Sequence, residues 1–148
     1  MGIKQFDNLV TTGKLKIEPP ADEELDGMLA SGHARLSDAE RKDLSFESRF
    51  DLAYNAAHSF ALAALRFHGY RSESRYLVFQ ALQQTVALEP SEWRVLDRAH
   101  VVRNRSEYEG YLAPDPKLLE AVIKIAREIE QRVLRMRSST QKPPTKKR

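Results

Sequence analysis

Cysteine is absent from this chain of 148 residues. Its absence excludes disulfide bridges, thiol catalysis and metal sites with cysteine ligands. Long uncharged hydrophobic runs are also missing, so no segment approaches the ~20 residues that a membrane-spanning helix needs. The N-terminal residues lack a basic stretch followed by a hydrophobic one, so we expect no secretory signal, a cytoplasmic location and no membrane contact. A chain of this length can bury an ordinary core as a single domain.

Recognisable catalytic and metal-binding motifs are missing as well. The sequence contains no Gly-rich phosphate loop, no His-Glu-x-x-His and no Gly-x-Ser-x-Gly. Its four histidines do not pair at the spacing of helical metal ligands, and the Glu-x-x-His pairs of a di-iron bundle do not occur. We therefore expect no metal and no cofactor.

The net charge of +3 would favour a nucleic-acid partner, but this charge is unevenly distributed along the chain. Residues 137–148 carry five basic side chains and no acid, so residues 1–136 carry a net charge of −2. Because this segment also lacks hydrophobic residues, we expect 137–148 to form a disordered basic tail. Any surface that binds anions in the remaining chain must be a local patch.

Hydrophobic residues recur at spacings of three and four along most of the chain, which predicts amphipathic helices. No segment alternates with a period of two, so the fold class is all-α. Short loops favour antiparallel neighbours, hence an up-down bundle of four to five helices over 46–136. Gly69, Gly110 and the Asp115-Pro116 pair are typical of helix ends. The main helices are predicted over 46–68, 73–87, 91–109 and 116–136.

Residues 1–45 are expected to form an N-terminal arm with short helices. Pro19 and Pro20 prevent a helix from continuing past residue 18. One short helix is predicted from Asp22 to about Ala30, and a capping-box pattern at 37–40 predicts a second one to about Leu44. The three expected segments are thus 1–45, 46–136 and 137–148.

The segment 93–111 holds the side chains best suited to a functional site. Between residues 94 and 105 it contains four arginines and one acidic residue. Arginine offers a planar fork that fits phosphate oxygens, and a tyrosine ring can stack on a base. The plain alternative is a solvated helix face with ion pairs such as Arg103–Glu107 or Arg105–Glu109. On a helix, one stripe contains Arg94, Arg98, Val101, Arg105 and Tyr108, and an adjacent stripe contains His100, Arg103, Asn104, Glu107 and Tyr111.

About residues 46–136 together resemble a HEPN domain. The resemblance rests on the long helix 46–67, the helix around 76–82, and the run Arg103-Asn104-Arg-Ser-Glu-Tyr108 before a final amphipathic helix. That family consists of small helical bundles, usually homodimers, and many members are metal-independent endoribonucleases of toxin, phage-defence and RNA-processing systems. Their motif is an arginine, often a polar residue, and a histidine several residues later. The resemblance therefore implies a homodimer that acts on RNA.

The resemblance also implies roles for individual residues. Arg103 matches the motif arginine and would stabilise charge on phosphorus, Asn104 matches the polar residue, and Tyr108 stands where the histidine is expected. An unperturbed phenol has a pKa of about 10, so Tyr108 is suited to donating a hydrogen bond or proton, or to stacking, rather than to acting as a base. His100 lies one turn before Arg103. Nucleic-acid contacts are expected at Arg94, Arg98, His100, Arg105 and Tyr111.

Two alternatives stay open beside the ribonuclease hypothesis. The first is a non-catalytic HEPN module that binds a nucleotide or a protein partner, such as a nucleotidyltransferase antitoxin that attaches AMP to Tyr108 or Tyr111. The second is a helical interaction protein without any contact to nucleic acid. The aromatic residues of 54–79 are expected in core or dimer packing, and His58 is expected to face the bundle interior.

Overall fold

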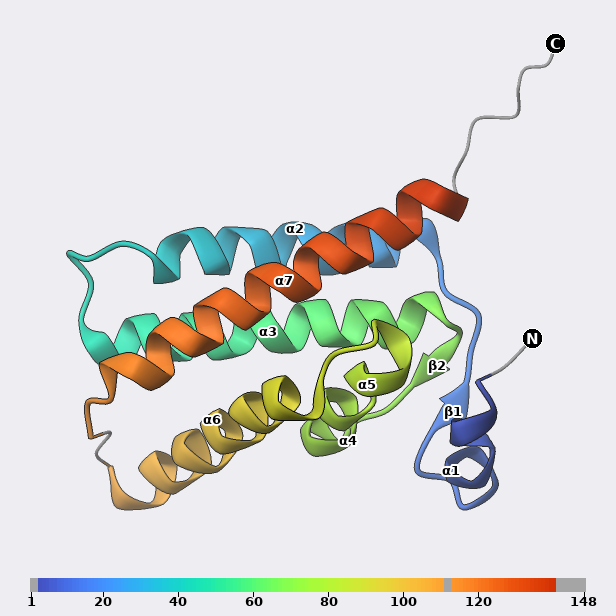
Figure 1. The fold of residues 1–148 in the computed structure, drawn as a ribbon, viewed down its shortest axis with the longest axis horizontal. Helices are drawn as coiled ribbons and strands as arrows, with labels where there is room; N and C mark the ends of the chain where they lie inside the picture. Colours follow the sequence, from blue (N-terminus) through green and yellow to red (C-terminus); the bar gives the residue numbers. More distant parts are fainter. Residues whose placement is uncertain (1–2, 111–112, 141–148) are drawn as a thin grey trace, which may run out of the picture.

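The computed structural model of the chain describes residues 3–110 and 113–140, and it is mainly α-helical (Figure 1). The predicted all-α fold is confirmed, with one small antiparallel sheet added to it. The elements in chain order are η1 (Lys4–Phe6), α1 (Asp7–Thr11), β1 (Lys16–Ile17), α2 (Asp22–Ala39), α3 (Phe46–Phe67), β2 (Tyr70–Arg71), α4 (Arg75–Gln80), α5 (Leu82–Thr85), α6 (Pro90–Glu109) and α7 (Pro116–Thr140).

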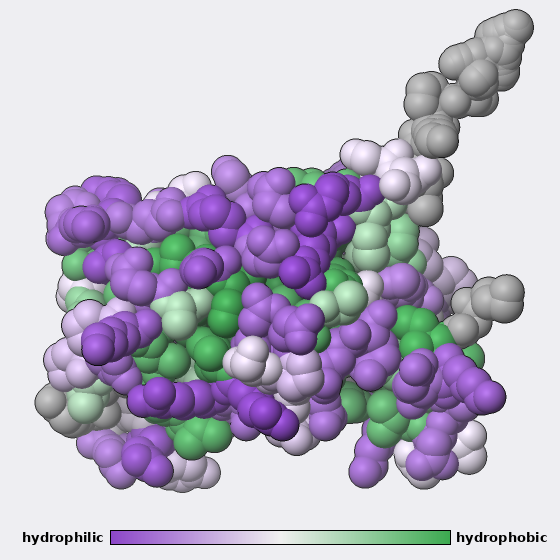
Figure 2. All heavy atoms as spheres, in the orientation of Figure 1, coloured by the Kyte–Doolittle hydropathy of each residue, from purple (hydrophilic) through white to green (hydrophobic). Residues whose placement is uncertain are grey.

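Helix α3 lies at the centre, and α2 and α7 pack along it (Figure 1). Its alanines let neighbouring helices come close, while Phe50 and Phe60 fill the space between them with fully buried rings. The stripe predicted for α7 is buried against this core at Val122, Ile129 and Val133. On the face drawn in Figure 2, hydrophobic side chains show between the helices, and hydrophilic ones cover most of the surface around them.

Helix α2 differs from the sequence prediction. A single helix spans Asp22–Ala39, so the prediction of one short helix ending near residue 30 and another over 37–44 is wrong. Gly32 lies in this continuation, at a position where a Cβ atom would lie 2.6 Å from the ring of Phe60. The glycine therefore serves as a contact point between α2 and α3. The boundary expected at residue 45 runs between two helices that share one core.

The segment predicted as one helix over 73–87 is divided into α4 and α5. Ala81 ends the first helix and begins the second, which turns Leu82 and Thr85 into the core. The predicted helix ends are confirmed nearby: Gly69 and Gly110 have φ angles of +90° and +68°, which glycine adopts without strain. Asp115 caps α7, since its side chain accepts a hydrogen bond from the Leu118 amide at 3.1 Å.

The N-terminal segment lies against the bundle through β1. Ile17 pairs with Tyr70 of β2, and each strand has only two residues, too few for an alternating pattern to appear in the sequence. The Ile3 amide donates to the Tyr70 hydroxyl at 2.7 Å, and the ring of Phe6 packs edge-on against Tyr70. Leu15 is buried. Residues 3–17 are therefore attached to the body at several points.

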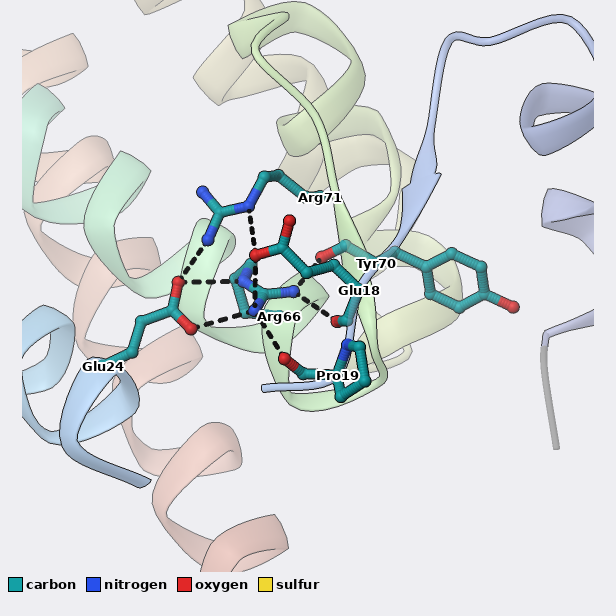
Figure 3. Close-up of polar contacts among 6 residues, drawn as sticks. All are labelled: Glu18, Pro19, Glu24, Arg66, Tyr70 and Arg71. Atoms are coloured by element: carbon teal, nitrogen blue, oxygen red, sulfur yellow. Dashed lines mark hydrogen bonds and ion pairs between the residues drawn. The ribbon is translucent and has the colours of Figure 1, made fainter. Parts of the chain in front are cut away.

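A buried arginine joins the end of this segment to two helices (Figure 3). Arg66 of α3 is 1% exposed, and its guanidinium pairs with the Glu24 carboxylate of α2 at 2.9 Å. It also donates to the main-chain oxygens of Glu18 and Pro19 at 2.7 and 3.1 Å. Arg71 pairs with both Glu18 and Glu24. Burial of a charge is tolerated here because the guanidinium has partners on several sides.

The C-terminal end of α7 also departs from expectation. The helix continues to Thr140, so the prediction of disorder is wrong for residues 137–140, and residues 141–148 lie outside the described part. Arg137 explains the extension, because it forms ion pairs with Asp22 and Asp26 of α2. No helix within the described residues combines the length and hydrophobicity needed to span a membrane.

Candidate functional site

The inner face of α6 places an imidazole against a buried phenol. Nδ1 of His100 lies 2.7 Å from the hydroxyl oxygen of Tyr54 on α3, and the two rings are stacked. On its other side, Nε2 of His100 lies 3.2 Å from the amide nitrogen of Asn104. Since that amide can only donate, Nε2 accepts and Nδ1 carries the proton that is donated to Tyr54. The network therefore selects one tautomer, with the Nε2 lone pair on the side of exposed Asn104.

Two guanidinium groups lie over the ring of Tyr54. The central carbons of Arg103 and Arg75 are 5.2 and 5.4 Å from the ring centroid, within the range of cation–π attraction. Arg75, at the start of α4, also donates to the side chain of Asn55 at 3.0 Å. Tyr54 is fully buried, and burial raises the pKa of its hydroxyl. The phenol is therefore a neutral hydrogen-bonding group that orients His100.

Arg103 is held by carboxylates as well as by the ring. Its Nε donates to Asp51 of α3 at 3.0 Å, and its Nη1 lies 3.3 Å from Glu107, which confirms that predicted ion pair. Its side chain is 26% exposed and lines an open cleft of about 520 Å³ between α3 and α6. Arg103 thus stands at the border between the buried cluster and solvent.

A second imidazole lies behind this cluster. His58 is half-buried on α3, as expected, with its ring edge-on to Phe79 at 5.8 Å. The pKa of His58 is lowered to about 4, mainly by burial and further by the charges of Arg75 and His100. His58 is therefore neutral at pH 7. We define the polar cluster as Tyr54, His58, Arg75, His100, Arg103 and Asn104.

The structure places four other predicted residues, Arg94, Arg98, Arg105 and Tyr108, outside the polar cluster. Tyr108 is 93% exposed on the outer face of α6, and Arg94 and Arg105 are exposed there too. Arg98 pairs with Asp115 at 3.1 Å. Tyr111 lies outside the described residues. Of the predicted site, the structure brings together His100, Arg103 and Asn104.

Sequence reasoning missed Tyr54 and Arg75 as members of the site. Tyr54 was expected to pack in the core, which it does, but its hydroxyl contributes the bond that fixes His100. Arg75 is the first residue of α4, directly after the polar residues 72–74, and its type alone does not distinguish it from a solvated arginine. The only signal in the sequence is a tyrosine and a histidine four residues apart on α3, at the spacing of one helix face.

Within the described residues, no group of three His, Asp or Glu side chains is arranged to hold a metal ion. The available chemistry in the polar cluster is thus two imidazoles, two guanidinium groups, an amide and a phenol. Comparisons of the chain with known protein families, curated proteins and solved structures gave no match.

Proposed function

We propose that this chain is a HEPN-like protein that binds RNA and cleaves it without a metal ion, with His100 as the proton-transferring group. The observation that carries the proposal is the position of His100. Its Nδ1 is fixed by Tyr54 at 2.7 Å, its Nε2 lies beside exposed Asn104, and Arg103 lies over the same tyrosine ring. In this arrangement an oriented imidazole and a guanidinium contact the same tyrosine ring, and the guanidinium lines a cleft.

The proposed reaction follows from these groups. The substrate displaces the Asn104 amide from Nε2 of His100. Nε2 then accepts the proton of a ribose 2′-hydroxyl, and the 2′-oxygen forms a bond to the adjacent phosphorus. The bond from phosphorus to the 5′-oxygen breaks, that oxygen takes a proton from water, and the resulting hydroxide takes the proton held by His100. The products are a 2′,3′-cyclic phosphate and a 5′-hydroxyl end. Arg103 stabilises the negative charge that grows on the phosphoryl oxygens.

To contact Arg103, a substrate phosphate must replace one of the carboxylates that pair with it. Asp51 and Glu107 are more than half exposed, so their ion pairs with Arg103 are weak and solvent-screened. A phosphate group entering the cleft replaces one of these pairs with a charge-assisted contact. The exposed side chains of Arg94 and Arg105 of α6 supply further phosphate contacts at the edge of the dimer interface proposed below.

A cleavage assay tests this function. The purified chain is incubated with single-stranded RNA in the presence of EDTA, and products are analysed for cyclic phosphate ends. We expect His100→Ala to lower the rate by about 100-fold or more. Arg103→Ala should lower both cleavage and RNA binding. Arg135, an exposed arginine of α7, provides the matched control, and Arg135→Ala should cleave normally. Absence of both cleavage and RNA binding in the wild type would contradict the proposal.

We further propose that the chain forms a homodimer through the outer face of α6. Val101 and Tyr108 lie two turns apart on this helix and are 48% and 93% exposed. Large exposed hydrophobic side chains on one face favour burial against a partner. A mass measurement in solution tests this, because Val101→Glu with Tyr108→Ser should convert a dimer into a monomer. A monomeric wild type would exclude it.

The exposure of Tyr108 also favours a second candidate function, a module controlled by a nucleotidyltransferase antitoxin. Its hydroxyl is accessible for transfer of AMP, with pyrophosphate leaving from ATP. Mass spectrometry after coexpression with a candidate transferase would show an AMP adduct on Tyr108. Loss of the adduct in Tyr108→Phe would support this candidate.

A further inference from the structure

A separate cavity lies on the other side of α4, between the N-terminal segment and the bundle. Its volume is about 550 Å³, which is in the size range of small-molecule sites. Its lining comes from α1, the turn into β1, the loop before α4, and α4 itself. None of its lining residues belongs to the polar cluster, so the proposed RNA cleavage does not account for it.

The rim of this cavity is rich in hydrogen-bond donors. Lys14 and Lys16 lie on one side, are exposed, and form no ion pair within the described residues. Ser72 and Ser74 lie on the other side. Each serine oxygen already accepts from a main-chain amide, so its hydroxyl hydrogen remains to be donated. Glu73 is the acidic residue of the lining that does not belong to an ion pair.

The floor of the cavity is hydrophobic and carries an aromatic ring. Leu9 of α1 and Leu77 of α4 contribute apolar surface. Tyr76 is 45% exposed, and its ring is held edge-on by Trp93 at 5.9 Å between centroids. A ring that is fixed on one side and exposed on the other can stack on a planar ligand without losing much side-chain entropy.

The wall formed by the N-terminal segment is firmly placed. Gly13, with φ +81°, makes the turn that brings Lys14 and Lys16 to the rim, and the Lys14 amide is bonded to the Leu9 carbonyl at 2.9 Å. The strand pair and the buried Arg66 hold this wall to α2 and α3 (Figure 3). The cavity is therefore built by contacts far apart in sequence rather than by a loose arm.

We infer that this cavity binds a small organic anion, a planar ring bearing a phosphate group, of the size of a nucleoside monophosphate. The ring would stack on Tyr76 above Leu9 and Leu77. The phosphate would meet the two lysines and the two serine hydroxyls. An anion is favoured over a cation because the side chains of the rim that are not already paired are donors, with Glu73 the exception.

Titration of the isotope-labelled full chain with AMP, followed by amide NMR spectra, tests the inference. We expect saturable shifts at the amides of Lys14, Ser72 and Tyr76. Adenosine has the ring without the phosphate, and inorganic phosphate lacks the ring. Each should bind at least about tenfold more weakly than AMP. Equal binding of inorganic phosphate would overturn the claim that the ring contributes.

Substitutions separate this cavity from other anion contacts. Lys14→Glu combined with Lys16→Glu should weaken AMP binding about tenfold or more, and Tyr76→Ala should do the same. Lys124→Glu, on the exposed face of α7, is the matched control and should leave AMP affinity unchanged. The proposal would be overturned if AMP caused no amide shifts. It would also be overturned if the shifts occurred at amides of α6 and persisted in the double lysine variant. His100→Ala should retain AMP binding, so this result is distinct from the fate of the ribonuclease proposal.

Discussion

The hydroxyl of Tyr54 and Nδ1 of His100 are 2.7 Å apart, although 46 residues separate them in the sequence. This bond joins the central helix α3 to the middle of α6. Beyond it, Arg103 adds an ion pair to Asp51 at 3.0 Å. In the C-terminal half of α6, where Val101, Asn104 and Arg105 are exposed, these polar links add to the packing of Val102 against the core.

Replacing Tyr54 by phenylalanine removes this link while keeping the ring. The Nδ1 proton of His100 then loses its acceptor, and we expect the free energy of unfolding to fall by about 1–2 kcal/mol. Denaturant unfolding followed by circular dichroism measures this change. Tyr76→Phe is the control, since its hydroxyl makes no hydrogen bond within residues 3–110 and 113–140. A larger loss in the control would contradict the assignment.

The close contact of α2 with α3 predicts opposite effects for two glycines of the same helix. Gly32→Ala places a Cβ atom 2.6 Å from the buried Phe60 ring, so it should lower the free energy of unfolding by about 1–3 kcal/mol. Gly27→Ala meets no atom within 4 Å and should raise stability by up to about 1 kcal/mol through helix propensity. Thermal unfolding of both variants checks the pair. Equal shifts of the same sign would disprove the contact.

Acid sensitivity should depend on Glu24. Its hydrogen bond with Arg66, the largest cause, together with the charges of Arg66 and Arg71, lowers the pKa of Glu24 to about 2. A carboxyl whose pKa is lowered by folding stabilises the fold above its unfolded pKa, and this contribution is lost as the pH falls towards 2. Glu24→Gln should therefore be less stable than the wild type above about pH 5 and approach it between pH 5 and 2.

The control for this experiment is the neighbouring exposed residue Glu23. Glu23→Gln should follow the wild-type pH dependence, because its side chain is exposed at the start of α2. Unfolding by urea at a series of pH values provides the measurement for both variants. If the stability gap between Glu24→Gln and the wild type did not narrow on acidification, the ion pair with Arg66 would not stabilise the fold.

His58 is a base, yet its effect on the free energy of unfolding should change with pH in the same direction as that of Glu24. Its folded pKa of about 4 lies below the unfolded value of about 6.5, so protonation favours the unfolded chain. The stability gained from neutral His58 is present above pH 6.5 and declines as the pH falls towards 4. His58→Leu should flatten this part of the profile. NMR titration of the imidazole signals checks the cause, and titration of His58 near 6.5 would refute it.

Local signals in the sequence predict the helix ends well. Gly69, Gly110 and Asp115 have conformations or caps that depend on residues within one turn, and the structure confirms all three. The long stripes of α3 and α7 are also predicted, because a period of 3.6 is repeated over many turns. Such features require no knowledge of which helix packs against which.

Features that depend on contacts between residues far apart in the chain could not be predicted from the sequence. Helix α2 continues past residue 30, where Gly32 packs against Phe60, and α7 continues to Thr140, near the ion pair of Arg137 with α2. For the candidate site, the helix stripe of His100, Arg103 and Asn104 was predicted. Its partners Tyr54 and Arg75 were not, since the way helices cross decides which side chains meet.

The position of Arg66 has a consequence for hydrogen exchange. Detaching residues 18–20 would break three of its hydrogen bonds at once, to the Glu18 carbonyl, the Glu18 carboxylate and the Pro19 carbonyl. The Glu18 amide, bonded to the Gly69 carbonyl at 2.9 Å, is therefore protected by the same unit as α3. An N-terminal segment of this kind should exchange its amide protons by cooperative opening together with the central helix, not by independent fraying.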